Sequence, residues 1–181
     1  MPLLRTLVIG LGNPILGDDG VGWRVAEEVQ RRLQIADFRF QSEPAESQSA
    51  IYNPKSEIEV DCFALGGLSL MERLIGYDRA IIVDAVTTGR PPGTVSRFRL
   101  DDLPGFSTAH TSAAHDTSLQ NALRVGRTMG AHLPGAVIVV GVEARSVYDF
   151  SEILSPPVAE AVPVAARLVF ELLEEESHGL S

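Results

Sequence analysis

The chain has 181 residues, 45% of them hydrophobic, which is enough to bury the core of one compact domain. Its formal net charge of −9 disfavours nucleic acids and anionic membrane surfaces as partners. A single cysteine excludes an internal disulfide and a cysteine-rich zinc site and fits a reducing compartment. The sequence opens on no signal-peptide pattern and has no apolar run long enough to cross a bilayer, so we expect a domain of the cytoplasm.

The first predicted element is a short apolar strand that ends in a glycine-rich loop. Residues 7–9 form a β-rich apolar run, and residues 10–14 read Gly-Leu-Gly-Asn-Pro. Apolar side chains then recur at helical spacing, with charged side chains between them, at Val21, Val25, Ala26, Val29 and Leu33. The pattern predicts a β-loop-α unit whose loop lies at the carboxyl end of the strand.

A polar stretch without a clear period occupies residues 39–57. A loop of this length inside a compact domain is usually a flap or an insertion, and we expect one of these here. Residues 58–63 then alternate like a strand, Gly66 and Gly67 interrupt the pattern, and the spacing of Leu68, Met71 and Leu74 predicts a helix.

The second half of the chain continues the alternation of strands and helices. We predict strands at 79–86, 94–100 and 136–142 and helices at 117–129 and 158–174. Alternation at this spacing is typical of a parallel sheet covered on both faces. We therefore expect an α/β fold, a single three-layer domain over residues 1–175, with a twisted, mostly parallel sheet of about five strands between helices and a tail at 176–181.

The loop at residues 10–22 does not fit a nucleotide-binding pattern. Ile15 stands where a dinucleotide fingerprint needs its third glycine, and no Gly-Lys-Ser/Thr ending is present. Asp18 and Asp19 place negative charge where phosphates would lie. Adjacent carboxylates at the start of a helix are more often caps than catalysts, and we interpret Asp18 as the cap.

Three side chains, Asp19 among them, could carry chemistry if they met at one edge of the sheet. Asp84 ends an apolar strand, at the edge where open α/β sheets bind ligands, although it could instead order the turn at 87–89. Of the two histidines before the helix at 117–129, His110 and His115, one is expected to be merely solvated. A set of Asp19, Asp84 and His115 would suit a divalent metal such as Zn²⁺ or Ni²⁺ and leave positions open for water or substrate. Cys62, within an apolar strand, is interpreted as an inert thiol.

The order of these motifs resembles the maturation endopeptidases of NiFe hydrogenases. The resemblance rests on the loop at 10–22, the strand at 82–86, the Pro-Gly-Thr turn at 92–94, the Ala-His pair at 114–115 and the final strand at 137–143. It implies a single α/β domain that removes a C-terminal extension from the hydrogenase large-subunit precursor after nickel insertion. By position, the metal-contacting and catalytic residues would be Asp19, Asp84 and His115, with Asp19 where the family often has Glu.

The resemblance also implies metal-assisted peptide hydrolysis, with either the substrate's own nickel or another divalent metal such as Zn²⁺ at the three residues. The expected partner is the large-subunit precursor, and the chain is expected to be a monomer. One alternative is a module that docks the large subunit without cutting it. Another is a peptidyl-tRNA hydrolase, whose first strand also runs into a Gly-Leu-x-Asn-Pro loop. That family has a histidine soon after the loop, whereas the first histidine here is His110, and the charge of −9 opposes tRNA binding.

Overall fold

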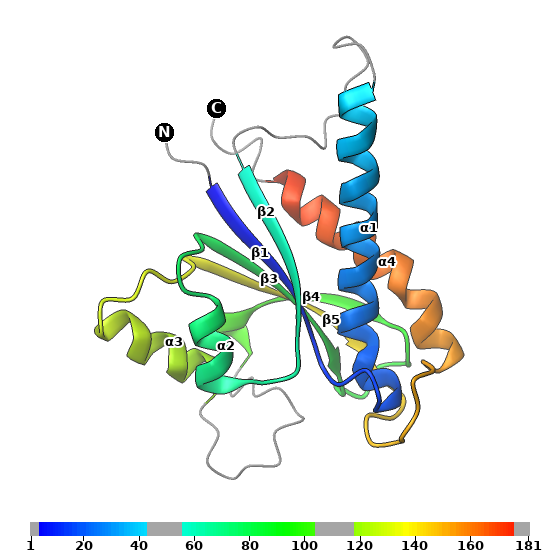
Figure 1. The fold of residues 1–181 in the computed structure, drawn as a ribbon. Helices are drawn as coiled ribbons and strands as arrows, with labels where there is room; N and C mark the ends of the chain where they lie inside the picture. The colour runs from blue at the N-terminus through cyan, green and yellow to red at the C-terminus, as the bar shows by residue number, and fades with distance from the viewer. Residues whose placement is uncertain (1–3, 43–55, 104–117, 176–181) are drawn as a thin grey trace.

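The computed structural model describes residues 4–42, 56–103 and 118–175, which alternate between strands and helices along the chain (Figure 1). The strands are β1 (Leu4–Leu11), β2 (Ser56–Phe63), β3 (Arg79–Val86), β4 (Val95–Arg99) and β5 (Ala136–Glu143). The helices are α1 (Val21–Ser42), α2 (Gly67–Arg73), α3 (Leu119–Thr128) and α4 (Pro156–Glu175), with short 3-10 helices η1 (Gly17–Gly20) and η3 (Leu100–Asp102).

The five strands form one sheet in the order β2-β1-β3-β5-β4. The first four are mutually parallel, and β4 runs antiparallel to β5 at one edge. Parallel strands joined through helices place their carboxyl ends at the same end of the sheet, so the loops after β1, β2, β3 and β5 gather there. We call this end of the sheet the carboxyl edge.

Helices cover both faces of the sheet, as the strand pattern predicts. In Figure 1, α1 and α4 lie on one side of the sheet and α2 and α3 on the other. Successive strand residues point to opposite faces. Val8, Ile81 and Val83 pack under α1 and α4, whereas Ile9 and Ile82 pack under α2 and α3. The three-layer α/β fold with a mostly parallel five-stranded sheet is confirmed.

The polar stretch expected as a loop at residues 39–57 is partly regular at both ends. Helix α1 continues to Ser42, and β2 begins at Ser56, so the prediction was wrong at these ends. The sequence from Val21 to Ser42 has one glycine, at its second position, and no proline before Pro44, so nothing in the backbone stops the helix earlier. Residues 43–55 lie outside the described part. None of the helices that the structure describes is long and apolar enough to cross a membrane.

Candidate functional site

Glycines allow the start of α1 to press against the carboxyl edge of the sheet. A Cβ atom at Gly22 would lie 2.2 Å from the carbonyl oxygen of Leu11 and 2.5 Å from that of Val83. A Cβ atom at Gly10 would lie 2.2 Å from the carbonyl oxygen of Gly22. No side chain fits in these gaps, so the backbone of α1 touches both β1 and β3. The loop between β1 and α1 is thereby folded back over the ends of these two strands.

Asp19 lies in this folded-back loop, within η1, and the residue is 0% exposed. Its Oδ2 atom accepts a hydrogen bond of 2.7 Å from the backbone N–H of Asn13. Gly12, at φ +118°, passes so close that a Cβ atom there would lie 1.9 Å from the Asp19 carbonyl oxygen. The left-handed φ and the close approach both require glycine. Gly12 and Asn13 thus hold Asp19 in place, Gly12 by its close backbone approach and Asn13 by its hydrogen bond to the carboxylate.

Asp84 lies at the same edge, near the end of β3, and is 1% exposed. The preceding residue, Val83, pairs with Gly10 of β1, and Asp84 itself pairs with Gly141 of β5. Strand alternation places Asp84 on the face of Ile82, the face covered by α2 and α3. Because η1 contacts β3, the structure brings the loop of Asp19 and the strand end of Asp84 to one place. Two buried carboxylates at one edge concentrate negative charge that a cation could balance.

Asp18 holds a distant loop, and its interpretation as a local helix cap was wrong. Its carboxylate accepts hydrogen bonds from the backbone N–H groups of Arg145 (2.9 Å), Ser146 (3.3 Å) and Ser155 (2.6 Å). The hydroxyl of Ser155 donates a fourth, of 2.8 Å. These partners lie between β5 and α4, more than a hundred positions away along the chain. Asp18 therefore locks η1, and with it Asp19, to the loop after β5.

Glu143 is a buried carboxylate of this edge that the sequence reasoning missed. It ends β5, is 3% exposed, and accepts hydrogen bonds from the N–H groups of Thr88 (2.7 Å) and Gly89 (2.8 Å) and from the Thr88 hydroxyl (2.7 Å). The sequence suggested that Asp84 could order the turn at 87–89. In the structure, Glu143 holds this turn. A charged residue at the end of a buried strand was the available signal, the same one that singles out Asp84.

The third residue of the expected set, His115, lies outside the described residues, as does His110. The described chain resumes at Ser118, whose hydroxyl oxygen caps α3 by accepting a hydrogen bond of 3.3 Å from the N–H of Asn121. Within residues 4–42, 56–103 and 118–175, no group of three or more His, Cys, Asp or Glu side chains is arranged to hold a metal ion. Of the three residues expected to form the set, the described part of the chain thus contains two, Asp19 and Asp84, at one edge of the sheet.

Cys62, in β2, does not resemble a nucleophile. Burial raises the pKa of its thiol to about 11, and the nearby carboxylate of Glu27 adds to this effect. The thiolate form that would attack a substrate is therefore scarce near neutral pH. This supports the interpretation of Cys62 as an inert thiol.

Several loops at the carboxyl edge carry exposed apolar side chains. They come from the loops after β1, β2 and β5 and include Ile15, Leu65, Tyr148 and Phe150, the last two 77% and 86% exposed. The first and third of these loops are joined, because Leu16 and Ser151 form a β-bridge. Exposed apolar groups gathered in one region are typical of a surface that binds another protein.

Comparison with known proteins gives one consistent result. The family model for hydrogenase maturation proteases (HycI) matches residues 51–172. The hydrogenase expression/formation protein HupD of Thiocapsa roseopersicina is 27% identical over 169 residues, which cover 93% of this chain and 67% of that protein. The hydrogenase 2 maturation protease of Escherichia coli (strain K12) is 26% identical over 173 residues, 95% of this chain and 92% of that protein.

Solved structures of hydrogenase maturation peptidases have the same fold. The structure of the hydrogenase maturating endopeptidase HybD from E. coli matches with a TM-score of 0.68 and 26% identity, covering 96% of this chain and 94% of that one. A hydrogenase 2 maturation peptidase from a Thaumarchaeota archaeon matches with a TM-score of 0.59 and 28% identity, covering 93% of this chain and 97% of that one.

Proposed function

The chain belongs to the hydrogenase maturation protease family, and on that premise we propose that it cleaves the C-terminal extension from a NiFe hydrogenase large-subunit precursor once nickel has been inserted. The observation that carries the proposal is the pair of aspartates, Asp19 and Asp84, buried at one edge of the sheet beside exposed apolar loops. Residence in the cytoplasm is part of the proposal and rests on the single cysteine, which suits a reducing compartment.

The role proposed for the two aspartates is to bind a divalent metal next to the scissile peptide bond. Carboxylate oxygens suit Ni²⁺ and Zn²⁺ when an imidazole completes the set, and His115 is the residue proposed for that position. Three side chains leave other positions of the metal open, which suits a metal that arrives already held by another protein. We therefore take the metal to be the nickel of the precursor, with a protein-borne Zn²⁺ as the alternative. A bound metal of either kind supplies Lewis acidity at a peptide carbonyl or an attached water.

The remaining residues of the edge have supporting parts in this reaction. Asn13 holds the Asp19 carboxylate through its N–H, and Asp18 fixes η1 against the loop after β5. The fold itself positions both residues: the N–H of Asn13 holds the Asp19 carboxylate, and Asp84 is buried near the end of β3. Preorganised charge of this kind is effective because little rearrangement is needed at the moment of reaction.

A folded protein is the substrate best matched to the surroundings of the aspartates. The exposed apolar side chains of Leu65, Tyr148 and Phe150 lie in the loops after β2 and β5, where they would bury against the precursor. A module that docks the precursor without cutting it would use the same apolar loops. The two functions differ in the aspartates, which docking alone does not require.

The test is processing of a nickel-loaded precursor by the variants Asp19→Asn, Asp84→Asn and His115→Ala. Each should lower the rate of cleavage by roughly 100-fold, because each removes a group proposed to contact the metal. Glu171→Gln is the control, since it removes one negative charge from an exposed position of α4 outside the carboxyl edge and should leave the rate unchanged. Normal processing by a folded Asp84→Asn protein would refute the site.

A further inference from the structure

A groove lies between helices α1 and α4, the two helices that cover one face of the sheet (Figure 1). Its volume is about 640 Å³, which is within the range of concave sites that bind ligands. Its apolar lining comes from the loop after β5 and the first turns of α4, with the side chains of Ile153, Leu154, Ala159, Val162 and Pro163. We call it the α1–α4 groove.

The apolar lining of the groove is accessible from solvent. Ile153 is 80% exposed, Ala159 and Pro163 are exposed, and Leu154 and Val162 are half-buried. The backbone under Ile153 is nevertheless fixed, because its N–H donates a hydrogen bond of 3.0 Å to the hydroxyl oxygen of Ser151. An apolar surface held in a defined shape loses little conformational entropy when a partner covers it.

Helix α1 supplies charged side chains to the same lining. Arg24 forms an ion pair of 3.2 Å with Glu27, and Arg31 forms one of 2.8 Å with Glu28. Glu152, in the loop after β5, forms no ion pair with any residue that the structure describes. The groove therefore suits a segment that combines apolar side chains with a positive charge.

One end of the groove adjoins the loop that carries Asp19. Glu152 lies shortly before Ser155, whose N–H and hydroxyl bind the Asp18 carboxylate at 2.6 and 2.8 Å. Arg24 donates a hydrogen bond of 3.5 Å from Nη2 to the carbonyl oxygen of Glu152, and it lies about one and a half helical turns after Asp19. In Figure 1 the start of α1 and the loop after β5 lie at the same end of the molecule. The groove is thus continuous with the carboxyl edge.

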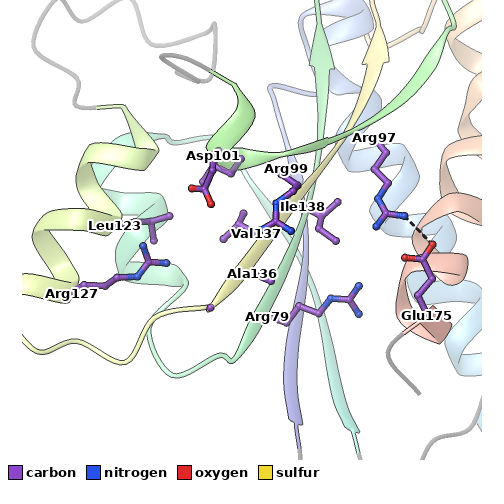
Figure 2. A pocket seen from close by; sticks show the side chains of 12 residues that line it. Arg79, Arg97, Arg99, Asp101, Leu123, Arg127, Ala136, Val137, Ile138 and Glu175 are labelled. Carbon is purple, nitrogen blue, oxygen red and sulfur yellow. Dashed lines mark hydrogen bonds and ion pairs between the residues drawn. The ribbon is translucent and has the colours of Figure 1, made fainter. Parts of the chain in front are cut away.

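A smaller pocket at the opposite end of the sheet has a different lining. Its volume is about 180 Å³, and Figure 2 shows several arginines and two carboxylates around it. One of these carboxylates, Glu175, forms an ion pair of 2.9 Å with Arg97. Of these two pockets, the α1–α4 groove is the one that combines an exposed apolar lining with a position beside Asp19.

We propose that the α1–α4 groove binds the C-terminal extension of the precursor, through a short apolar segment that carries a positive charge. The inference rests on the proposed function for the identity of this partner. A groove of this volume accommodates a peptide segment and not the face of a folded protein, so the body of the precursor is left to the exposed loops of the carboxyl edge. An extension held against Ile153 and Ala159 keeps the scissile bond close to Asp19, which raises the effective concentration of that bond at the site.

The test compares the affinity of the full chain for two nickel-free forms of the precursor, one with the extension and one that ends at the mature C-terminus. Neither form is a substrate under the proposed function, so binding is measured apart from cleavage. We expect the form with the extension to bind about tenfold more tightly, because it alone fills the groove.

Variants of exposed residues assign this preference to the groove. Ala159→Arg fills the groove and adds a positive charge, so it should abolish the preference for the extension. Val164→Arg is the matched control: it introduces the same side chain at a position of α4 that is 45% exposed and does not line the groove, and it should keep the preference. Ile153→Ser should reduce the preference several-fold through lost apolar contact. Glu152→Gln should reduce it less, and more at low than at high ionic strength.

The outcomes separate this inference from the proposed function. Equal affinity for the two forms, or a preference that Ala159→Arg leaves intact, overturns the assignment of the groove and leaves the peptidase function standing. A preference that Ala159→Arg abolishes supports the groove even where the nickel-loaded precursor is not cut, a result that would contradict the peptidase function alone. Absence of binding to either form overturns both. A wild-type dimer that Ala159→Arg separates, measured by light scattering, would assign the groove to a second copy of the chain and overturn the proposal.

Discussion

Asp18→Asn should destabilise the protein far more than the loss of a surface charge would. The wild-type carboxylate receives three backbone N–H groups and the hydroxyl of Ser155, and the residue is 2% exposed. Three of the four donors approach the same oxygen, Oδ2, and only the N–H of Ser155 approaches Oδ1. An asparagine has one acceptor oxygen and one NH₂ group, so at least one set of donors must face another donor.

The size of the effect depends on which donors lose their partner. With the amide oxygen at the Oδ2 position, the Ser155 hydroxyl and the N–H groups of Arg145 and Ser146 keep an acceptor, and only the N–H of Ser155, which lies 2.6 Å from Oδ1, faces the NH₂ group. A buried donor without a partner costs about 1–3 kcal/mol, and the three hydrogen bonds that remain lose the strength that a charged acceptor gives them. The free energy of unfolding should therefore fall by about 2–3 kcal/mol.

Equilibrium unfolding in urea measures this change, with Asp149→Asn as the matched control. Asp149 is exposed in the same loop, so its variant should stay within about 0.5 kcal/mol of the wild type. A loss from Asp18→Asn no larger than that of the control would refute the role assigned to Asp18. Such a result would mean that the loop after β5 is held by other contacts.

Three further predictions concern single residues elsewhere. Gly22→Ala should prevent folding or lower the melting temperature sharply, because its Cβ would lie 2.2 Å from a strand carbonyl oxygen; a melting temperature like that of the wild type would contradict the close packing. A hydrogen bond from Arg31 lowers the pKa of Glu28 to about 2, so the stability it contributes is present above pH 4.5 and lost as the pH falls toward 2. The difference in free energy of unfolding between wild type and Glu28→Gln should shrink over that range, and a constant difference would exclude the effect. Because partial burial raises the pKa of Cys62 to about 11, its thiol should react with iodoacetamide at pH 8 much more slowly than glutathione does, and equal rates would contradict the raised pKa.

The fold was predictable because it depends on patterns that are local in the sequence. The apolar run of β3 and the helical spacing of Val21 and Val25 each identify an element, and their alternation implies a parallel sheet. Elements whose ends depend on weak signals were less well predicted. The end of α1 at Ser42 is one example, since polar residues are compatible with both a helix and a loop.

The candidate site was predictable only in part, because its contacts connect distant parts of the chain. Asp19 and Asp84 could be proposed from strand ends, which parallel topology brings to one edge. The partner of Asp18 could not, since Ser155 lies 137 positions away and nothing in its local sequence indicates the contact.

The most direct test of the proposed peptidase function is the intact mass of a hydrogenase large-subunit precursor before and after incubation with this protein, in nickel-loaded and nickel-free forms. We expect loss of a defined C-terminal peptide from the nickel-loaded form alone, because the metal proposed to meet Asp19 and Asp84 comes with the substrate. Cleavage of both forms would contradict the substrate-borne nickel and favour a metal held by the protein itself. An unchanged mass in both forms, with the precursor bound, would contradict the peptidase function and leave the docking module.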